Sequence, residues 1–328
     1  MEDMAGKSMK ARLIIWLRVV VSLSLLAWLL TSIGAESTFE VVTQSSPGYL
    51  LAAFAVYLLG VGVRALRWQI LLGAQGIRFP LRKLTSLYFA GAFFSMFLPT
   101  GVGGDAVRMV EVARDSDSKA LSASTVVVDR VVGLLVLLGI GLVSLPFNHR
   151  LVTPEVVAAL ILLNVAAYGG TLMLHEQSAI DALAQHLPPL GWLLNRKAVK
   201  TVYRSLKRYD GFSLAKALLV SLLFNLLLIF TNVLIARALR VHLAAGYFLL
   251  FVPIISFLLA LPVSLSGLGI REGGYVYLFG QAGVSSPIAL SMSLCFYAIT
   301  LATGLIGGVI YALQGLMGLR KGARSAPR

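Results

Sequence analysis

The chain has 328 residues, of which 58% are hydrophobic and only 13% are charged. Because soluble domains are typically about a quarter charged, this composition leaves too little polar surface to face water. It argues against a soluble domain, a nucleic-acid-binding domain and a disordered chain, and it favours a polytopic membrane protein. The net charge of +14 is therefore interpreted as topology and lipid contact, not as DNA binding.

The sequence contains no recognisable disulfide framework or metal-binding motif. It has a single cysteine, Cys295, and its four scattered histidines form no His-x-x-x-His pair. A disulfide framework needs an even set of cysteines, and the common zinc motifs need paired ligands at fixed spacing. The sequence therefore predicts neither a metal centre nor a cofactor.

Six apolar segments are long enough to cross a bilayer as helices, which takes about 20 residues. They cover approximately residues 13–33, 49–72, 120–147, 154–174, 214–238 and 287–317. No small-residue cleavage motif follows the first segment, so it is predicted to be a retained anchor or an uncleaved signal-like start.

Two further apolar segments, 84–98 and 247–261, have only about 15 residues each. Each ends in Leu-Pro, then a glycine-rich break, then a short helical segment, 105–114 or 270–281. This pattern predicts a re-entrant hairpin, because non-helical backbone at membrane depth must be buried in protein or line a cavity. The alternative is an ordinary proline-kinked helix with a surface loop.

Basic residues concentrate on one side of the membrane if both hairpins return to the side from which they enter. That side holds the two termini and residues 64–83, 105–119 and 175–213. The opposite side holds only Arg150, Arg237, Arg240 and Arg271. The positive-inside rule then predicts a multi-pass protein of the cytoplasmic (inner) membrane, with both termini in the cytoplasm.

Residues 1–328 are predicted to form a single integral membrane domain with two related halves, 48–147 and 214–317. Arg64-Ala-Leu-Arg67 recurs as Arg237-Ala-Leu-Arg240, and each copy precedes a short apolar segment, a Leu-Pro and a glycine-rich break. Each break is followed by Ala-Leu-Ser-x-Ser at the start of the next span. In the predicted topology the two hairpins enter from opposite sides, and such inverted repeats are typical of transporters. A duplication kept only for packing is the alternative.

The connector between the halves, residues 175–213, is basic. Within it, residues 196–209 alternate apolar and basic positions at helical spacing. This pattern predicts a basic amphipathic helix on an anionic leaflet, or else a site that recruits a partner.

Charged residues inside predicted spans are costly and mark functional sites by default. Arginine suits phosphate because its planar fork binds two oxygens at once, and helix starts after the glycine-rich breaks offer free N–H groups. The predicted site for an anionic lipid headgroup consists of Arg108, Arg130, Arg271, Gly103, Gly104, Gly267 and Gly269. Five charged residues are predicted to support it: Asp105, Asp129, Glu272, Arg64 and Arg67. Alternatively, these charges only form internal salt bridges that hold the hairpins, and both interpretations can be true together.

No catalytic residue is predicted. The run Gly101-x-Gly103-Gly104 resembles a phosphate loop, but no Lys-Ser/Thr follows it and an apolar segment precedes it. Neither a Gly-x-Ser-x-Gly elbow nor a His-Glu-x-x-His motif is present.

Four motifs together resemble the lysylphosphatidylglycerol synthase transmembrane family, also called the flippase-like domain. They are Arg67-Trp68, Leu98-Pro99-x-Gly-x-Gly-Gly-Asp105-x-x-Arg108, Asp129-Arg130 and Ser266-Gly-Leu-Gly-Ile-Arg271-Glu272-Gly273. The resemblance covers nearly the whole chain. One departure is Asp129, because a glutamate is expected in the acidic-Arg pair of the family.

In bifunctional members of that family, the membrane domain is thought to move aminoacylated phosphatidylglycerol between leaflets, and a soluble C-terminal domain makes it. This chain ends about ten residues after its last predicted span. We therefore expect a stand-alone, UPF-type membrane member, and aminoacyl transfer is not carried over.

The sequence thus predicts a membrane lipid translocator, not an enzyme, and its expected partners are membrane lipids with anionic headgroups. The alternative is an accessory or enzymatic component of polyprenyl-phosphate, glycolipid or hopanoid synthesis. A scaffold for other membrane proteins is a third possibility. An enzyme should show a catalytic group with a matched acid–base partner, and only the Asp, Arg and Glu set is available.

Overall fold

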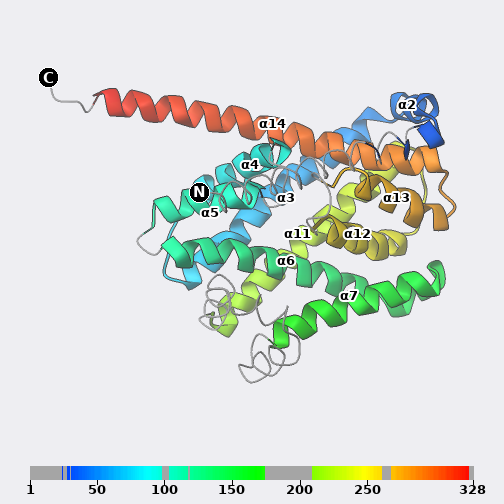
Figure 1. The fold of residues 1–328 in the computed structure, drawn as a ribbon, viewed down its shortest axis with the longest axis horizontal. Helices are drawn as coiled ribbons and strands as arrows, with labels where there is room; N and C mark the ends of the chain where they lie inside the picture. Colours follow the sequence, from blue (N-terminus) through cyan, green and yellow to red (C-terminus); the bar gives the residue numbers. More distant parts are fainter. Residues whose placement is uncertain are drawn as a thin grey trace, which may run out of the picture.

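The computed structural model describes residues 24, 28–29, 31–97, 103–116, 119–173, 209–260 and 267–324. All regular structure within these ranges is helical (Figure 1). The helices are α2 Ala35–Thr43, α3 Pro47–Ala74, α4 Leu81–Phe97, α5 Gly103–Arg114, α6 Lys119–Asn148, the 3-10 helix η1 His149–Leu151, α7 Pro154–Met173, α11 Gly211–Ala238, α12 Ala245–Ala260, α13 Ile270–Gln281 and α14 Ser286–Arg324. The predicted all-α fold is confirmed.

Four described helices are long and apolar enough to cross a membrane. They are Pro47–Ala74, Leu121–Asn148, Gly211–Ala238 and Ser286–Gln314, which match four of the predicted spans. Helix α7 covers the fifth predicted span, and its described apolar part is Pro154–Gly169. Most of the predicted span 13–33 and most of the predicted connector 175–213, including nearly all of its amphipathic segment 196–209, lie outside the described residues. The chain is a multi-pass membrane protein.

Local sequence signals explain where several helices begin. Pro47 and Pro154 occupy the first positions of α3 and α7, where the missing N–H has no intrahelical partner to lose. Asp210 caps α11 by accepting a hydrogen bond from the Ser213 N–H at 2.9 Å. The hydrogen bonds from Ser213 also lower the pKa of the Asp210 carboxyl.

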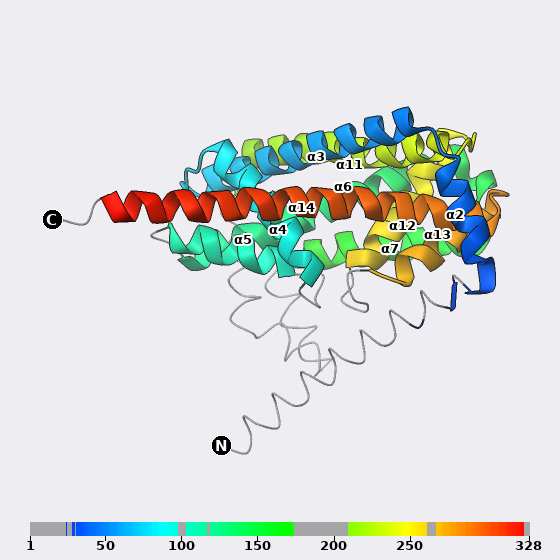
Figure 2. The ribbon, with the colours of Figure 1, turned by 90° about the horizontal axis from the view of Figure 1, so that it is seen from above.

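Helices α6 and α14 run close to the long axis of the molecule, and α3 and α11 cross it at a slant (Figure 1). Helices α3 and α11 pack side by side and are antiparallel, and α6 and α14 also run in opposite directions (Figures 1 and 2). The short pair α4–α5 lies toward one end of the bundle, and the short pair α12–α13 lies toward the other.

The same order of contacts occurs in the helices α3 to α6 and in the helices α11 to α14. Helix α4 packs against α14, and its counterpart α12 packs against α6. Each second short helix packs against the long helix that follows it, α5 on α6 and α13 on α14. The break residues 98–102 and 261–266 lie outside the described residues, so the re-entrant hairpins and the inverted halves stay predictions.

The two Arg-Ala-Leu-Arg copies have different environments in the structure. The two Arg-Ala-Leu-Arg copies were expected to end equivalent spans, but Arg67 is buried within α3, seven residues before its end, and Arg237 and Arg240 are exposed at the end of α11. A tetrapeptide of common residues can recur by chance. The two copies lie at different positions along their helices, so their side chains have different surroundings. The tetrapeptide therefore gives the predicted repeat no support, and the order of helices and their contacts is the observation consistent with it.

The two ends of the bundle differ in charge. At the end where α4 and α5 lie, Lys83 forms an ion pair with Asp115. This basic end carries the cationic residues Arg78, Arg82, Lys83, Arg114 and Lys216. At the opposite end, the Ser46 N–H donates to the Ala238 carbonyl oxygen at 2.9 Å, and the described cations close to that junction are Arg237 and Arg240.

Candidate functional site

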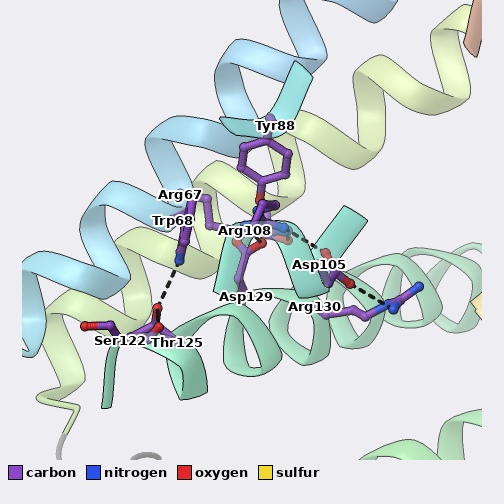
Figure 3. Close-up of polar contacts among 10 residues, drawn as sticks. Arg67, Trp68, Tyr88, Asp105, Arg108, Ser122, Thr125, Asp129 and Arg130 are labelled. Carbon is purple, nitrogen blue, oxygen red and sulfur yellow. Dashed lines mark hydrogen bonds and ion pairs between the residues drawn. The ribbon is translucent and has the colours of Figure 1, made fainter. Parts of the chain in front are cut away.

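Asp129 is the centre of a buried ion cluster between α3, α4, α5 and α6 (Figure 3). Its Oδ1 accepts from the Arg67 Nε at 2.7 Å, and its Oδ2 accepts from the Arg108 Nη2 at 3.1 Å and from the Tyr88 hydroxyl. The Asp129 side chain is 1% exposed, and the side chains of Arg67 and Arg108 are 2% and 3% exposed. A carboxylate this deeply buried is stable only when it is paired and hydrogen-bonded, and this one has both kinds of partner.

Arg108 is fixed from several directions. Its guanidinium lies 3.7 Å from the ring centroid of Tyr88 and 4.2 Å from that of Trp68, which is cation–π geometry. Its Nη1 also donates to Asp105 Oδ1 at 3.0 Å. The Trp68 Nε1 in turn donates to the Thr125 hydroxyl at 3.0 Å. Two carboxylates and two rings therefore hold this arginine in one orientation.

Arg130 follows Asp129 in α6, but adjacent residues on a helix do not face each other. Arg130 therefore contacts a carboxylate other than Asp129. Its Nη1 lies 2.9 Å from Asp105 Oδ2, and its side chain is 37% exposed. Asp105 thus joins Arg108 of its own helix to Arg130 of α6.

A second polar cluster lies at the start of α13. The Arg271 Nε donates to the Ser293 hydroxyl at 3.1 Å, and Arg271 forms an ion pair with Glu272. The Arg271 guanidinium lies 4.4 Å from the ring centroid of Tyr297. Arg271 is therefore held against α14, which carries both Ser293 and Tyr297.

The glycines near the breaks have backbone roles in this structure. Gly267 and Gly269 have φ values of 81° and 82°, a region that favours glycine. The Gly269 N–H donates to Glu272 Oε2 at 2.7 Å, and the Gly104 N–H donates to the Ser95 hydroxyl at 3.0 Å. These N–H groups therefore already have partners within the protein.

One cavity, with a volume of about 320 Å³, is lined by residues of both polar clusters. Its charged lining residues are Arg64, Arg108, Arg130, Arg271, Asp105 and Asp129. The three arginines predicted to bind a headgroup thus face the same cavity. Of the other predicted residues, Gly104 lines the cavity, whereas Arg67, Gly103, Gly267, Gly269 and Glu272 are not part of its lining.

The break-side ends of both short helix pairs contribute to this lining. Ser95 and Met96 come from the end of α4, and Gly104 comes from the start of α5. Leu259 comes from the end of α12, and Arg271 from the start of α13. Residues next to both breaks therefore line the same cavity.

Several lining residues were missed in the sequence. They are Tyr57, Tyr88, Gly91, Ala92, Ser95, Met96, Tyr297 and Thr300. In α4 the lining residues recur at i, i+3, i+4, i+7 and i+8 from Tyr88, the spacing of one helix face. A search for polar and small residues at that spacing within the apolar segment 84–98 would have found them.

The charged lining is positive overall. The described lining residues include four arginines and two aspartates. Surroundings of low dielectric constant strengthen the attraction between this net positive charge and an anion. The cavity therefore suits an anion, and the planar guanidinium forks suit one with several oxygens.

The chain matches the family model described as Lysylphosphatidylglycerol synthase TM region over residues 15–308. It is 25% identical over 123 residues to a UPF0104 membrane protein of Pyrococcus horikoshii, an alignment that covers 37% of each chain. It is also 25% identical over 122 residues to a UPF0104 membrane protein of Methanocaldococcus jannaschii, which covers 37% of this chain and 36% of that protein. The alignments thus span little more than a third of the length of these relatives. The family model, in contrast, covers most of the chain, and the chain belongs to the lysylphosphatidylglycerol synthase TM-region family.

Proposed function

We propose that this protein is a translocator that moves a polar lipid, with an anionic or phosphate-bearing headgroup, between the two leaflets of the membrane. The observation that carries this proposal is the shared cavity. Arg108 from α5, Arg130 from α6 and Arg271 from α13 all line it. Charges inside a membrane protein are expensive and usually mark a substrate pathway.

The arrangement of the helices supports translocation in addition to binding. The two short helix pairs lie toward opposite ends of the bundle, and their break-side ends line the cavity from both directions. Transporters with inverted repeats bind substrate near the membrane midplane, where broken helices from the two repeats meet. In this proposal the cavity binds the headgroup without making or breaking covalent bonds. The cavity residues are therefore given a binding role and no enzymatic role.

Lysine substitutions at the cavity arginines test the proposed function. We expect Arg108→Lys, Arg130→Lys and Arg271→Lys to slow lipid translocation by about tenfold, because lysine keeps the charge but loses the bidentate fork. The measurement is the rate of dithionite quenching of fluorescent phosphatidylglycerol in proteoliposomes that contain the purified protein. Arg237→Lys is the matched control, since Arg237 is exposed at the end of α11.

Thermal unfolding of the same preparations separates loss of function from loss of fold. Stable variants that translocate slowly support the proposal. If all three lysine variants translocate lipid at the wild-type rate, the arginines are only structural and the assigned site is wrong.

We also propose that the basic end of the bundle faces the cytoplasm. In a Cys295→Ser background, we expect Ser116→Cys to react with a membrane-impermeant maleimide from the cytoplasmic side, and Ser285→Cys to react from the outside. The reason is that Ser116 follows α5 at the basic end, whereas Ser285 precedes α14 at the opposite end. Labelling of both cysteines from one side would contradict the inverted arrangement.

A further inference from the structure

Arg64 differs from the other charged residues that line the cavity. Within the described residues it forms no ion pair, whereas Arg108, Arg130 and Arg271 each do. Its Nε is buried without a hydrogen-bond partner, as is the Nε of Arg108, so the feature that sets Arg64 apart is the missing carboxylate. Its guanidinium lies 4.8 Å from the ring centroid of Tyr88 and 5.2 Å from that of Phe224. The two rings place the cation, but they do not neutralise it.

The other cavity arginines are already paired with carboxylates of the protein. Arg108 contacts both Asp105 and Asp129, Arg130 contacts Asp105, and Arg271 contacts Glu272. A ligand that approaches these groups must share them with an internal carboxylate. At Arg64 it meets a guanidinium with no such competitor.

Arg67 provides a comparison, since it lies one turn further along the same helix. It is also basic and close to Phe224, with its guanidinium 5.9 Å from that ring centroid. However, its Nε is bound to Asp129 at 2.7 Å and its Nη1 donates to the Ser221 hydroxyl at 2.8 Å. The positive charge of Arg67 is therefore paired with a carboxylate of the protein, and Arg67 does not line the cavity.

The charge balance around the cavity indicates which ligand would fit. Adding the buried partners Arg67 and Glu272 to the charged lining gives five arginines and three carboxylates among the described residues. A ligand with net negative charge would offset this excess. A cationic group on the ligand would be repelled by it.

We propose that Arg64 is the residue through which the cavity holds its ligand, and that this ligand is an anion of the phosphate type without a cationic group. This inference rests on the proposed function in placing the ligand within the cavity. It goes further because the sequence predicted Arg108 as a headgroup ligand and Arg64 and Arg67 only as supporting charges, whereas this proposal makes Arg64 the main contact with the ligand. Arg67 and Arg108 hold the protein's own carboxylates, whereas Arg64 is available for the ligand.

Binding measurements on the purified full-length protein in detergent test this proposal. The melting temperature is followed during titration with dihexanoylphosphatidylglycerol, dihexanoylphosphatidylcholine or inorganic phosphate, because a ligand of the folded state raises it. We expect anionic dihexanoylphosphatidylglycerol to raise the melting temperature of the wild-type protein, and zwitterionic dihexanoylphosphatidylcholine to raise it much less. Arg64→Gln should bind the anionic probe at least about tenfold more weakly.

Two matched variants complete the experiment. Arg237→Gln removes an exposed arginine from the same protein and should bind like the wild type. Arg64→Lys keeps a cation and should bind between the wild type and Arg64→Gln; it decides the result if Arg64→Gln fails to fold.

Each outcome decides a part of the proposal. A response to inorganic phosphate that depends on Arg64 identifies free phosphate as sufficient, whereas a response to the lipid alone identifies a lipid headgroup; both support the role of Arg64. Unchanged binding by the Arg64 variants, no stabilisation by either anionic probe, or equal stabilisation by the choline lipid would overturn it.

The result is distinguishable from a failure of the proposed function. A wild-type protein that binds the anionic lipid through Arg64 but moves no lipid would overturn translocation and leave the binding role intact. Unchanged binding in Arg64→Gln, together with slow translocation in the lysine variants, would overturn only the role of Arg64.

Discussion

Asp129→Asn is expected to destabilise the protein by about 3–5 kcal/mol, the usual cost of removing one partner from a buried ion pair. Asp129 accepts hydrogen bonds from Arg67, Arg108 and Tyr88 in an environment almost closed to solvent. Asparagine has nearly the same shape, so the change removes the charge and little packing. Arg67 is left as a buried cation without a carboxylate among its described contacts, while Arg108 keeps Asp105.

Thermal and denaturant unfolding in the same detergent would measure this loss. Asp115→Asn is the matched control, because Asp115 pairs with Lys83 at the surface and exposed ion pairs contribute at most about 1 kcal/mol. Equal stability of the two variants would show that the Asp129 cluster is not a structural centre of the fold.

A double-mutant cycle separates the pair energy from the rest of the cluster. Arg67→Met combined with Asp129→Asn should cost less than the sum of the two single changes, since the second removes a charge that the first has left unpaired. Additive costs would mean that Arg67 and Asp129 are stabilised mainly by other contacts, such as the Arg67–Ser221 hydrogen bond.

The fold could be predicted because membrane helices depend mainly on local composition. A run of about 20 apolar residues leaves few alternatives to a helix in lipid, where every backbone group must find a partner. The predicted segments 49–72, 120–147, 214–238 and 287–317 accordingly match described helices. The packing of α3 against α11 was not predicted, because it joins segments far apart in the chain and depends on the whole arrangement of helices.

The candidate site could be predicted only in part. Arg108, Arg130 and Arg271 stand out because charges are rare within apolar segments. The charged residues around them were also predicted, but which residues pair was not, because Arg67 and Asp129, for example, are 62 residues apart in the chain and meet only through helix packing. The hydroxyls of Tyr57, Tyr297 and Thr300 were missed for the same reason, as such residues are common on helices and gain meaning only from the face on which they lie.

The structure also changes the interpretation of the Gly103-Gly104 sequence. A glycine-rich turn before a helix predicts backbone N–H groups for an anion. Here, however, the Gly104 N–H is bound to the Ser95 hydroxyl. A Cβ atom added at Gly104 would overlap the Gly91 carbonyl group and lie 2.5 Å from that hydroxyl. The absence of a side chain thus allows α4 and α5 to approach each other closely beside the cavity.

Gly104→Ala is therefore expected to destabilise the protein by about 1–3 kcal/mol, the usual cost of forcing an extra methyl group into a well-packed contact. The Gly91 carbonyl belongs to helical backbone and cannot move without disturbing α4. Gly62→Ala is the matched control, because a Cβ at Gly62 would meet nothing within 4 Å, and alanine there should stabilise α3 by up to about 1 kcal/mol.

Thermal unfolding and binding of dihexanoylphosphatidylglycerol, measured on the same samples, distinguish the two roles of Gly104. Loss of stability shows that the glycine is needed for helix packing. A Gly104→Ala protein that is as stable as the wild type but binds the lipid more weakly would instead favour the anion-binding role predicted from the sequence. Since the clash involves the backbone of α4 and the N–H already has a partner, we expect the first result.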